Sequence, residues 1–119
     1  MIESKRTTKE TSVVLRLDVE SGDRRIDIQC GFLRHMLELF AFHAGIGLDV
    51  KASGDVDVDY HHLTEDVGIL LGKAFEQARS GLNLQRYGWC ALPMDGSLVL
   101  VAVDFSGRGQ FEWKGEFPA

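Results

Sequence analysis

Apolar and polar positions alternate near the start of the chain in the manner of half-buried strands. Over residues 12–20, every second side chain from Val13 to Val19 is apolar, and most of the side chains between them are polar. Because successive side chains of a strand point to opposite faces, this run predicts a strand with one face in a core. Residues 25–30 alternate in the same way after a turn signal at residues 21–23. We therefore expect two strands that form a hairpin.

Two later segments repeat their apolar residues with helical spacing. The first covers residues 32–44, ahead of Gly45, and its apolar stripe consists of Leu33, Met36, Leu37 and Phe40. The second begins near residues 61–65 and stops at Gly81. Its stripe consists of Val67, Leu70, Leu71, Ala74, Phe75 and Ala78. Such stripes predict helices that pack one face against a core.

The remaining segments are strand-like. Alternation returns in residues 48–52, 56–58 and 110–117, while residues 89–92 and 98–105 are strand-like runs, the second of them apolar on both faces over residues 98–103. Together with the two helices, these runs predict an α+β fold in which helices pack on one face of an antiparallel-rich sheet.

The pattern also indicates an internal repeat. Two strands joined by a Ser-Gly turn occupy residues 12–30, and the same order recurs in residues 98–117, but only the first copy is followed by a helix. We interpret residues 1–85 as a first repeat unit and residues 86–119 as the strands of an incomplete second unit.

Composition narrows the class of partner. The 119 residues suffice for one domain with a modest core. The net charge of −5 disfavours nucleic acid, whose binding needs a cationic surplus, and no apolar run approaches the roughly 20 residues of a membrane span. Cys30 and Cys90 fit no paired-ligand spacing, so we expect reduced, buried thiols in a cytoplasmic protein.

Candidate chemistry is concentrated at the start of the second predicted helix. His61 and Glu65 are four residues apart, and His62 lies three residues before Glu65, so all three share one helical surface. Two imidazoles and one carboxylate form a ligand set for zinc, manganese, iron or nickel. Nearby carboxylates that could orient the imidazoles are Asp57, Asp59 and Asp66. The alternative is that the histidines only end a helix and face water.

Further candidates lie outside this segment. His35 and His43 are eight residues apart on the first predicted helix and share a side of it, although His43 alone also fits a helix-end histidine favoured by the helix dipole. Arg86 and Arg108 sit beside turn glycines, where arginines are good anion ligands. For either arginine alone, a solvated surface position is the competing interpretation.

These motifs, taken in order, resemble the imidazoleglycerol-phosphate dehydratase family. The matching segments are residues 6–11 at the N-terminus, residues 31–37 followed by His43, residues 54–66 with the paired histidines, and residues 86–88, 93–95 and 104–108. The resemblance runs over nearly the whole chain. It implies a fold built from ribosomal protein S5 domain 2-like repeats.

The resemblance also implies a reaction and a set of roles. The family removes water from imidazole glycerol phosphate to give imidazole acetol phosphate in histidine biosynthesis, with two Mn²⁺ ions per site acting on the imidazole ring. By matching position, the metal ligands would be His35, His61, His62 and Glu65. Glu10 and Glu65 would be catalytic, with Glu10 also at the substrate. His43, Arg86 and Arg108 would bind substrate, the two arginines through its phosphate. A homo-oligomer with sites at subunit interfaces is implied as well.

Departures from the family pattern keep an alternative open. Arg34 and Tyr60 stand where the family usually has Asp, Gly96 stands where it usually has Glu, and the second His-His-x-x-Glu motif is missing. The alternative is a catalytically inactive relative that binds metal or ligand, or only keeps the fold. A plain structural or interaction domain with fortuitous histidines is a third hypothesis.

Overall fold

The first part of the chain forms a four-stranded sheet. The computed structural model describes residues 1–20 and 22–118. They divide into two compact units, Met1–Leu82 and Asn83–Ala119. The sheet of the first unit contains β1 (Ile2–Thr7), β2 (Thr11–Asp18), β3 (Arg24–Ile28) and β4 (Gly47–Gly54) in the order β1-β2-β4-β3. Because β4 is antiparallel to β2 and parallel to β3, the sheet is mixed.

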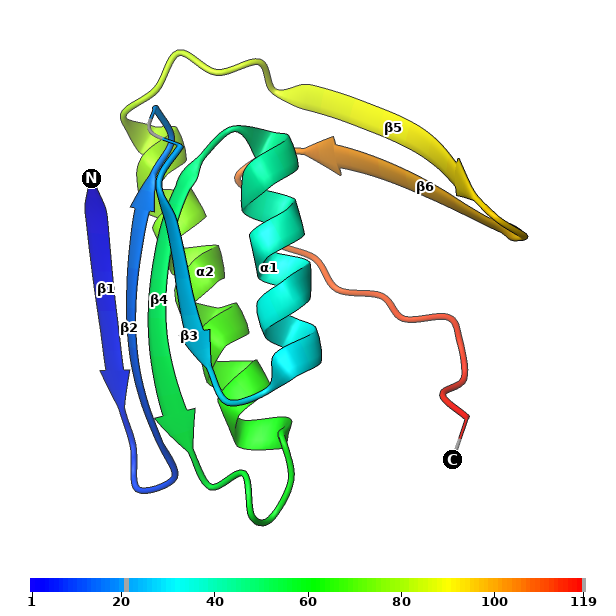
Figure 1. The fold of residues 1–119 in the computed structure, drawn as a ribbon. Helices are drawn as coiled ribbons and strands as arrows, with labels where there is room; N and C mark the ends of the chain where they lie inside the picture. Colours follow the sequence, from blue (N-terminus) through cyan, green and yellow to red (C-terminus); the bar gives the residue numbers. More distant parts are fainter. Residues whose placement is uncertain (21, 119) are drawn as a thin grey trace. The chain divides into compact units, whose positions relative to one another are not determined.

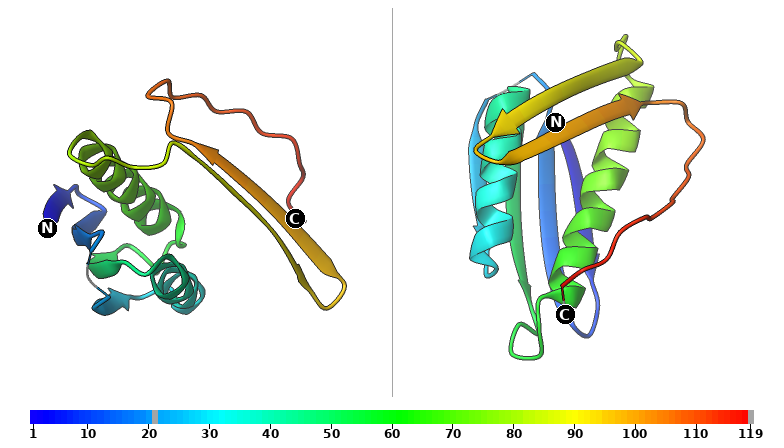
Figure 2. Two further views of the ribbon diagram at one scale, coloured as in Figure 1. Left: turned by 90° about the horizontal axis from the view of Figure 1, so that it is seen from above. Right: turned by 90° about the vertical axis from the view of Figure 1, so that its right-hand side faces the viewer.

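Both helices lie on the same face of this sheet (Figures 1 and 2). Helix α1 (Gly31–Ala44) connects β3 to β4, and helix α2 (His61–Ser80) follows β4. The prediction of an α+β fold with helices on one face is therefore confirmed. Neither helix in the described ranges combines the length and the apolar character needed to cross a membrane.

Strand pairing differs from the sequence prediction in two ways. The predicted hairpin of β2 with β3 is wrong, because β4 lies between them and bonds to both. The hairpin partner of β2 is instead β1, which the pattern analysis missed. Its sequence, Ile-Glu-Ser-Lys-Arg-Thr, alternates in exposure but holds one apolar residue, so it gave no apolar signal. Residues 56–58 form a turn that leads into α2.

The core lies between the sheet and the two helices. The β2 residues that alternate inwards pack with the inward residues of β4 and the stripe of α2, so that the side chains with almost no exposure are Val13, Leu15, Leu17, Leu48, Val50, Leu63, Val67 and Leu70. The predicted α2 stripe is buried or half-buried throughout. The α1 stripe is only partly confirmed, because Leu37 is buried but Met36 and Phe40 remain exposed.

The helices end at the predicted glycines. Gly45 has φ 67°, in the left-handed region that favours glycine, and its N–H is directed to the carbonyls of the last turn of α1. Gly81 follows α2 and donates its N–H to Ala78 O at 3.2 Å.

The second unit contains one hairpin, β5 (Tyr87–Met94) with β6 (Ser97–Asp104). A two-residue turn joins the strands, and Asp95 in this turn has φ 51°. The predicted strand at residues 110–117 is wrong, since that segment has no strand structure up to residue 118. Cys90 is exposed on β5, which corrects the expectation that both thiols are buried. Both cysteines are free, and Cys30 is half-buried.

A buried carboxylate joins the first two strands to α2. Asp66 is 6% exposed and accepts hydrogen bonds from Thr11 Oγ1 of β2 and, at 2.8 Å, from Arg6 Nε of β1. These bonds, led by that of Thr11, hold the pKa of Asp66 below its ordinary value. The ionised form is therefore the one that the fold stabilises.

Replacing this carboxylate should destabilise the first unit. We expect Asp66→Ala to lower the free energy of unfolding by about 2 kcal/mol, because it removes charge-assisted bonds and leaves the buried Thr11 hydroxyl without its acceptor. The measurement is urea denaturation. Asp57→Ala, at an exposed turn position, is the matched control and should change stability by no more than about 0.5 kcal/mol. Equal effects of the two changes would contradict the account.

Candidate functional site

Three connections meet at one edge of the sheet. They are the β1–β2 turn, the β3–α1 connection and the β4–α2 loop, seen at the bottom of Figure 1. We call this region the site edge and define it as residues 8–10, 29–35 and 54–65. Its position follows from topology: β1, β3 and β4 all run towards this edge, so the helices that follow β3 and β4 both begin there.

Backbone hydrogen bonds fasten these segments together. Asp55 donates its N–H to Glu10 O at 3.0 Å, and Gly54 donates its N–H to Gln29 Oε1 at 3.0 Å. The approach is close at Gly54, where a Cβ would lie 3.0 Å from Thr11 Cγ2 and 3.1 Å from Glu10 O. The glycine that precedes the histidine loop is therefore needed for contact with the β1–β2 turn.

The start of α2 is set by an aspartate outside the helix. Asp59 Oδ1 accepts the backbone N–H of His61 at 2.8 Å, while Tyr60, directly before the helix, makes no side-chain capping bond. Tyr60, where the family usually has Asp, therefore does not cap α2, and Asp59 satisfies the free N–H of His61 instead. Of the three carboxylates predicted to orient imidazoles, Asp59 bonds to backbone and Asp66 to Thr11 and Arg6.

His61 and Glu65 form the predicted i, i+4 pair. His61 Nε2 lies 2.9 Å from Glu65 Oε2, and both side chains are more than half exposed. The His61 ring stacks on the ring of His62, with centroids 5.1 Å apart. Two imidazoles and one carboxylate are thus gathered on the exposed first turn of α2.

His62 is oriented by a residue that sequence reasoning did not single out. Its Nδ1 lies 2.7 Å from Asp55 Oδ2, which directs the other ring nitrogen, Nε2, away from that carboxylate. The pKa of His62 is raised, chiefly by this hydrogen bond and the charge of Asp55, with smaller contributions from Glu10 and Asp59. Asp55 Oδ1 is buried and has no hydrogen-bond partner. Asp55 lies outside α2, in the loop that precedes it, so helical spacing does not predict this contact and only the loop geometry identifies it.

The other predicted residues are distributed between the two units. Glu10 lies in the β1–β2 turn, beside Asp55. His35 is exposed near the start of α1, whose first residues belong to the site edge, and Arg34 beside it is also exposed. His43 lies near the opposite end of α1, about 12 Å further along the helix axis at 1.5 Å per residue, where its ring meets Phe42 edge-on. The structure therefore does not bring His43 to the paired histidines.

Arg86 and Arg108 belong to the second unit, where Arg86 bonds to Asp104 and Arg108 adds positive charge near it. Arg86 donates two hydrogen bonds to this carboxylate, at 2.6 and 3.1 Å, and its guanidinium stacks over Tyr87. The pKa of Asp104 is lowered mainly by Arg86, and the charge of Arg108 contributes. Gly96 lies in the β5–β6 turn.

The ligand atoms are of the kinds that bind a divalent metal, but too few of them converge to hold one. Imidazole nitrogens and carboxylate oxygens are ligands for manganese and zinc, and the hydrogen bond from Asp55 to a prospective imidazole ligand is typical of metal sites. However, within residues 1–20 and 22–118, no three histidine, cysteine, aspartate or glutamate side chains converge on one ion position. Any metal held by His61, His62 or Glu65 needs ligands beyond those that converge here.

Comparison with known proteins identifies the family. Residues 28–119 match the family model described as imidazoleglycerol-phosphate dehydratase. The chain is similar to proteins of that name from a Hydrogenobaculum species, at 52% identity over 89% of this chain and 56% of the relative, and from Methanopyrus kandleri, at 48% identity over 96% of this chain and 58% of the relative.

Solved structures agree with this assignment. The crystal structure of imidazoleglycerol-phosphate dehydratase from Staphylococcus aureus matches with a TM-score of 0.76 and 35% identity, over 98% of this chain and 64% of that one. The Pyrococcus furiosus structure matches with a TM-score of 0.71 and 38% identity, over 88% of this chain and 56% of that one. The chain thus covers 56 to 64% of the length of these proteins, and it belongs to the imidazoleglycerol-phosphate dehydratase family.

Proposed function

We propose that this chain takes part in the metal-dependent dehydration of imidazole glycerol phosphate to imidazole acetol phosphate, a step of histidine biosynthesis. Family membership supports the reaction class. The observation that carries the proposal is the arrangement of His61, His62 and Glu65 on one exposed helical turn, with His62 fixed by Asp55. Exposure suits such a role, because ligands that face outward remain accessible to metal and substrate.

The metal we propose is Mn²⁺, held by His61, His62 and Glu65, with His35 as a further ligand from α1. Bound there, a divalent ion would act as a Lewis acid towards the imidazole ring of the substrate. In this proposal the Nδ1–H of His62 donates its hydrogen bond to Asp55, which leaves the lone pair of Nε2 free to bind the metal. The acidic residues of the loop, Asp55 to Asp59, add negative charge that favours a cation near the positive end of the α2 dipole.

Glu10 is the residue we propose for proton transfer. Its backbone is bonded to Asp55, and its carboxylate is close enough to His62 to raise the pKa of that imidazole. A carboxylate held beside the ligand turn, on a separate exposed loop, is placed to take or return a proton on a substrate bound there. The reaction releases one water molecule and leaves an enol, which becomes the ketone of imidazole acetol phosphate.

Completion of the site requires another source of ligands. No three donors converge within the described residues, and the chain covers 56 to 58% of the two relatives named above. We propose that a second polypeptide segment, on the same or a neighbouring chain in a homo-oligomer, supplies the missing ligands. Arg86 and Arg108 would hold the substrate phosphate, for which Arg86 would have to exchange its bonds with Asp104. His43, on the opposite end of α1, would line a site formed with a neighbouring copy.

Metal binding should depend on the pair at the start of α2. We expect His61→Ala and Glu65→Ala each to abolish Mn²⁺ binding by the chain, because each removes one member of the ligand pair. The measurement is elemental analysis after chelator treatment and refilling with manganese. His43→Ala is the control and should leave the stoichiometry unchanged, since this histidine lies near the other end of α1. Unchanged manganese content in His61→Ala and Glu65→Ala would overturn the assignment.

Turnover distinguishes the dehydratase from an inactive relative. We expect the manganese-loaded chain, as isolated, to convert imidazole glycerol phosphate to imidazole acetol phosphate, measured by mass as the loss of one water. Glu10→Gln should lower the rate on the order of 100-fold or more while manganese content stays the same. Full manganese binding without product would favour the competing function, a relative that binds metal but has lost catalysis.

A further inference from the structure

Two adjacent residues, Gly54 and Asp55, join the segments of the site edge. Gly54 ends β4, and Asp55 begins the loop to α2. Gly54 donates its N–H to Gln29 Oε1 in the β3–α1 connection, and Asp55 donates its N–H to Glu10 O in the β1–β2 turn, each at 3.0 Å. The side chain of Asp55 contacts His62 on α2 at 2.7 Å. Consecutive positions of the chain therefore contact three separate segments.

The Asp55 carboxylate has a single hydrogen-bond partner among the described residues. Its Oδ2 lies 2.7 Å from His62 Nδ1, whereas its Oδ1 is buried and meets no donor there. Because one oxygen is closed to water, the carboxylate depends on the bond to His62, and its charge strengthens that bond. The hydrogen bond at one ring nitrogen decides which nitrogen of a neutral histidine carries the proton. An acceptor at Nδ1 selects the Nδ1–H form, which is the minor form of a free histidine in water.

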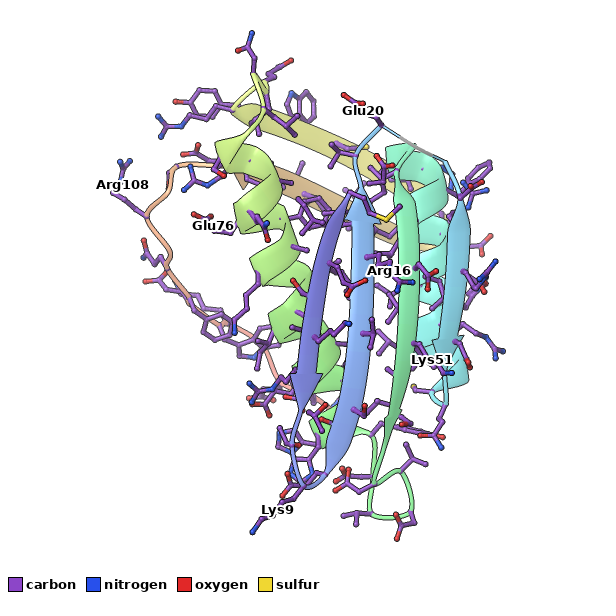
Figure 3. The ribbon with its side chains drawn as sticks, turned by 90° about the vertical axis from the view of Figure 1, so that its left-hand side faces the viewer. Lys9, Arg16, Glu20, Lys51, Glu76 and Arg108 are labelled. Carbon is purple, nitrogen blue, oxygen red and sulfur yellow. The ribbon has the colours of Figure 1, made fainter. Side chains whose placement is uncertain are left out.

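Gly54 sets the distance between the histidine loop and the β1–β2 turn, because it has no side chain. A Cβ at this position would lie 3.0 Å from Thr11 Cγ2 and 3.1 Å from Glu10 O, and both distances are tighter than ordinary van der Waals contact. Glu10 O is a backbone atom, so it moves only with the turn. Lys9, directly before Glu10, extends outward from this turn (Figure 3). A side chain at position 54 would therefore displace the turn that carries the Glu10 carboxylate.

We propose that Gly54 and Asp55 are positioning residues with separate roles. Asp55 selects the form of His62 in which the lone pair of Nε2 is free for a metal, and Gly54 allows the Glu10 turn to approach that imidazole. Each of them acts through another residue. The inference rests on the proposed function, in which His62 is a ligand and Glu10 transfers a proton, but both roles can be measured in the metal-free protein.

The role of Asp55 is tested by nitrogen-15 NMR of the histidine rings in metal-free protein, at a pH where the rings are neutral. We expect His62 to be mostly in the Nδ1–H form in the wild type and mostly in the Nε2–H form in Asp55→Ala. Asp55→Asn keeps an acceptor oxygen and should keep the wild-type form. Asp57→Ala removes a carboxylate from an exposed position of the same loop, so this matched control should change nothing. The Nε2–H form in the wild type, or the same form in wild type and Asp55→Ala, would overturn this role.

Metal affinity should follow the form of the His62 ring. Hydrogen-bond partners of ligand histidines typically contribute about 10- to 100-fold to metal affinity. We therefore expect Asp55→Ala to weaken Mn²⁺ binding by about that factor in a titration, and Asp55→Asn to retain most of the affinity. Equal affinities of wild type and Asp55→Ala would contradict the positioning role. A wild-type chain that binds no Mn²⁺ would contradict the proposed function, and the ring form of His62 would still decide what Asp55 does.

The role of Gly54 is tested at the amide of Asp55, whose N–H bonds to Glu10 O. Hydrogen exchange of this amide in metal-free protein should be about tenfold faster or more in Gly54→Ala, because the displaced turn no longer accepts the bond. Gly72→Ala is the matched control, since a Cβ at Gly72 meets nothing within 4 Å, and it should leave the exchange rate unchanged.

A second variant covers the case in which Gly54→Ala does not fold. Thr11→Ser/Gly54→Ala removes the clash with Thr11 Cγ2 and keeps the hydroxyl that bonds to Asp66, so only the clash with the turn remains. It should show the same faster exchange of the Asp55 amide. Wild-type exchange in a folded variant that carries Gly54→Ala would refute the role of Gly54.

Turnover separates the two roles. In the Mn²⁺-loaded chain, the folded Gly54→Ala variant should keep its Mn²⁺ affinity within about twofold, while kcat falls on the order of 100-fold, because a misplacement of about 1 Å can cost that much. Wild-type kcat in this variant would contradict the inference. Absence of turnover in the wild type would contradict the proposed function alone, because the NMR and exchange measurements use metal-free protein.

Discussion

The buried carboxylate of Asp66 is the constraint on which the site depends. It holds Arg6 of β1 and Thr11 of β2 against the first turn of α2, directly after the histidine pair and Glu65. Because Glu10 precedes Thr11, the same attachment brings the β1–β2 turn to the loop that carries Asp55. Adjacent residues of α2 therefore have different roles. The carboxylate of Glu65 faces solvent as a candidate ligand, whereas that of Asp66 is buried and holds the strands to the helix.

The two units treat a similar pattern differently. In the first, the sequence pattern of two strands around a Ser-Gly pair is followed by α1 and β4, and β3 forms its hydrogen bonds with β4. In the second, residues 110–117 have the alternation of a strand, but no equivalent of β4 lies between them and β6 in the described residues. Since strands need a neighbour to satisfy their backbone groups, this segment is irregular for lack of a partner.

The sequence predicted the helices and most of the strands, but it did not predict which strands pair with each other. Helices α1 and α2 and strand β2 follow from periodicity, which reflects burial, whereas β5 and β6 follow from continuous apolar runs although their residues are exposed. The position of β3 beside β4 does not follow from either, because a crossover through α1 leaves no local signal and the Ser-Gly turn resembles that of a hairpin. β1 was missed because an edge strand with inward residues such as Ser4 and Arg6 lacks an apolar stripe. In the site, the His61–Glu65 contact could be predicted from helical spacing. The contact of Asp55 with His62 depends on the conformation of a loop, and the distance of His43 from the paired histidines depends on the direction of α1, so neither could be predicted.

The most direct measurement of whether the site edge binds metal is a Mn²⁺ titration followed by NMR of the imidazole nitrogens. Manganese is paramagnetic, and its broadening of a resonance falls steeply with distance, so the four histidines report their own proximity to the ion. The account predicts that the signals of His61 and His62, as ligands, broaden at the lowest Mn²⁺ concentration, and that the signal of His43, which is not a ligand, broadens least. Simultaneous loss of all four signals, or loss of His43 first, would contradict it.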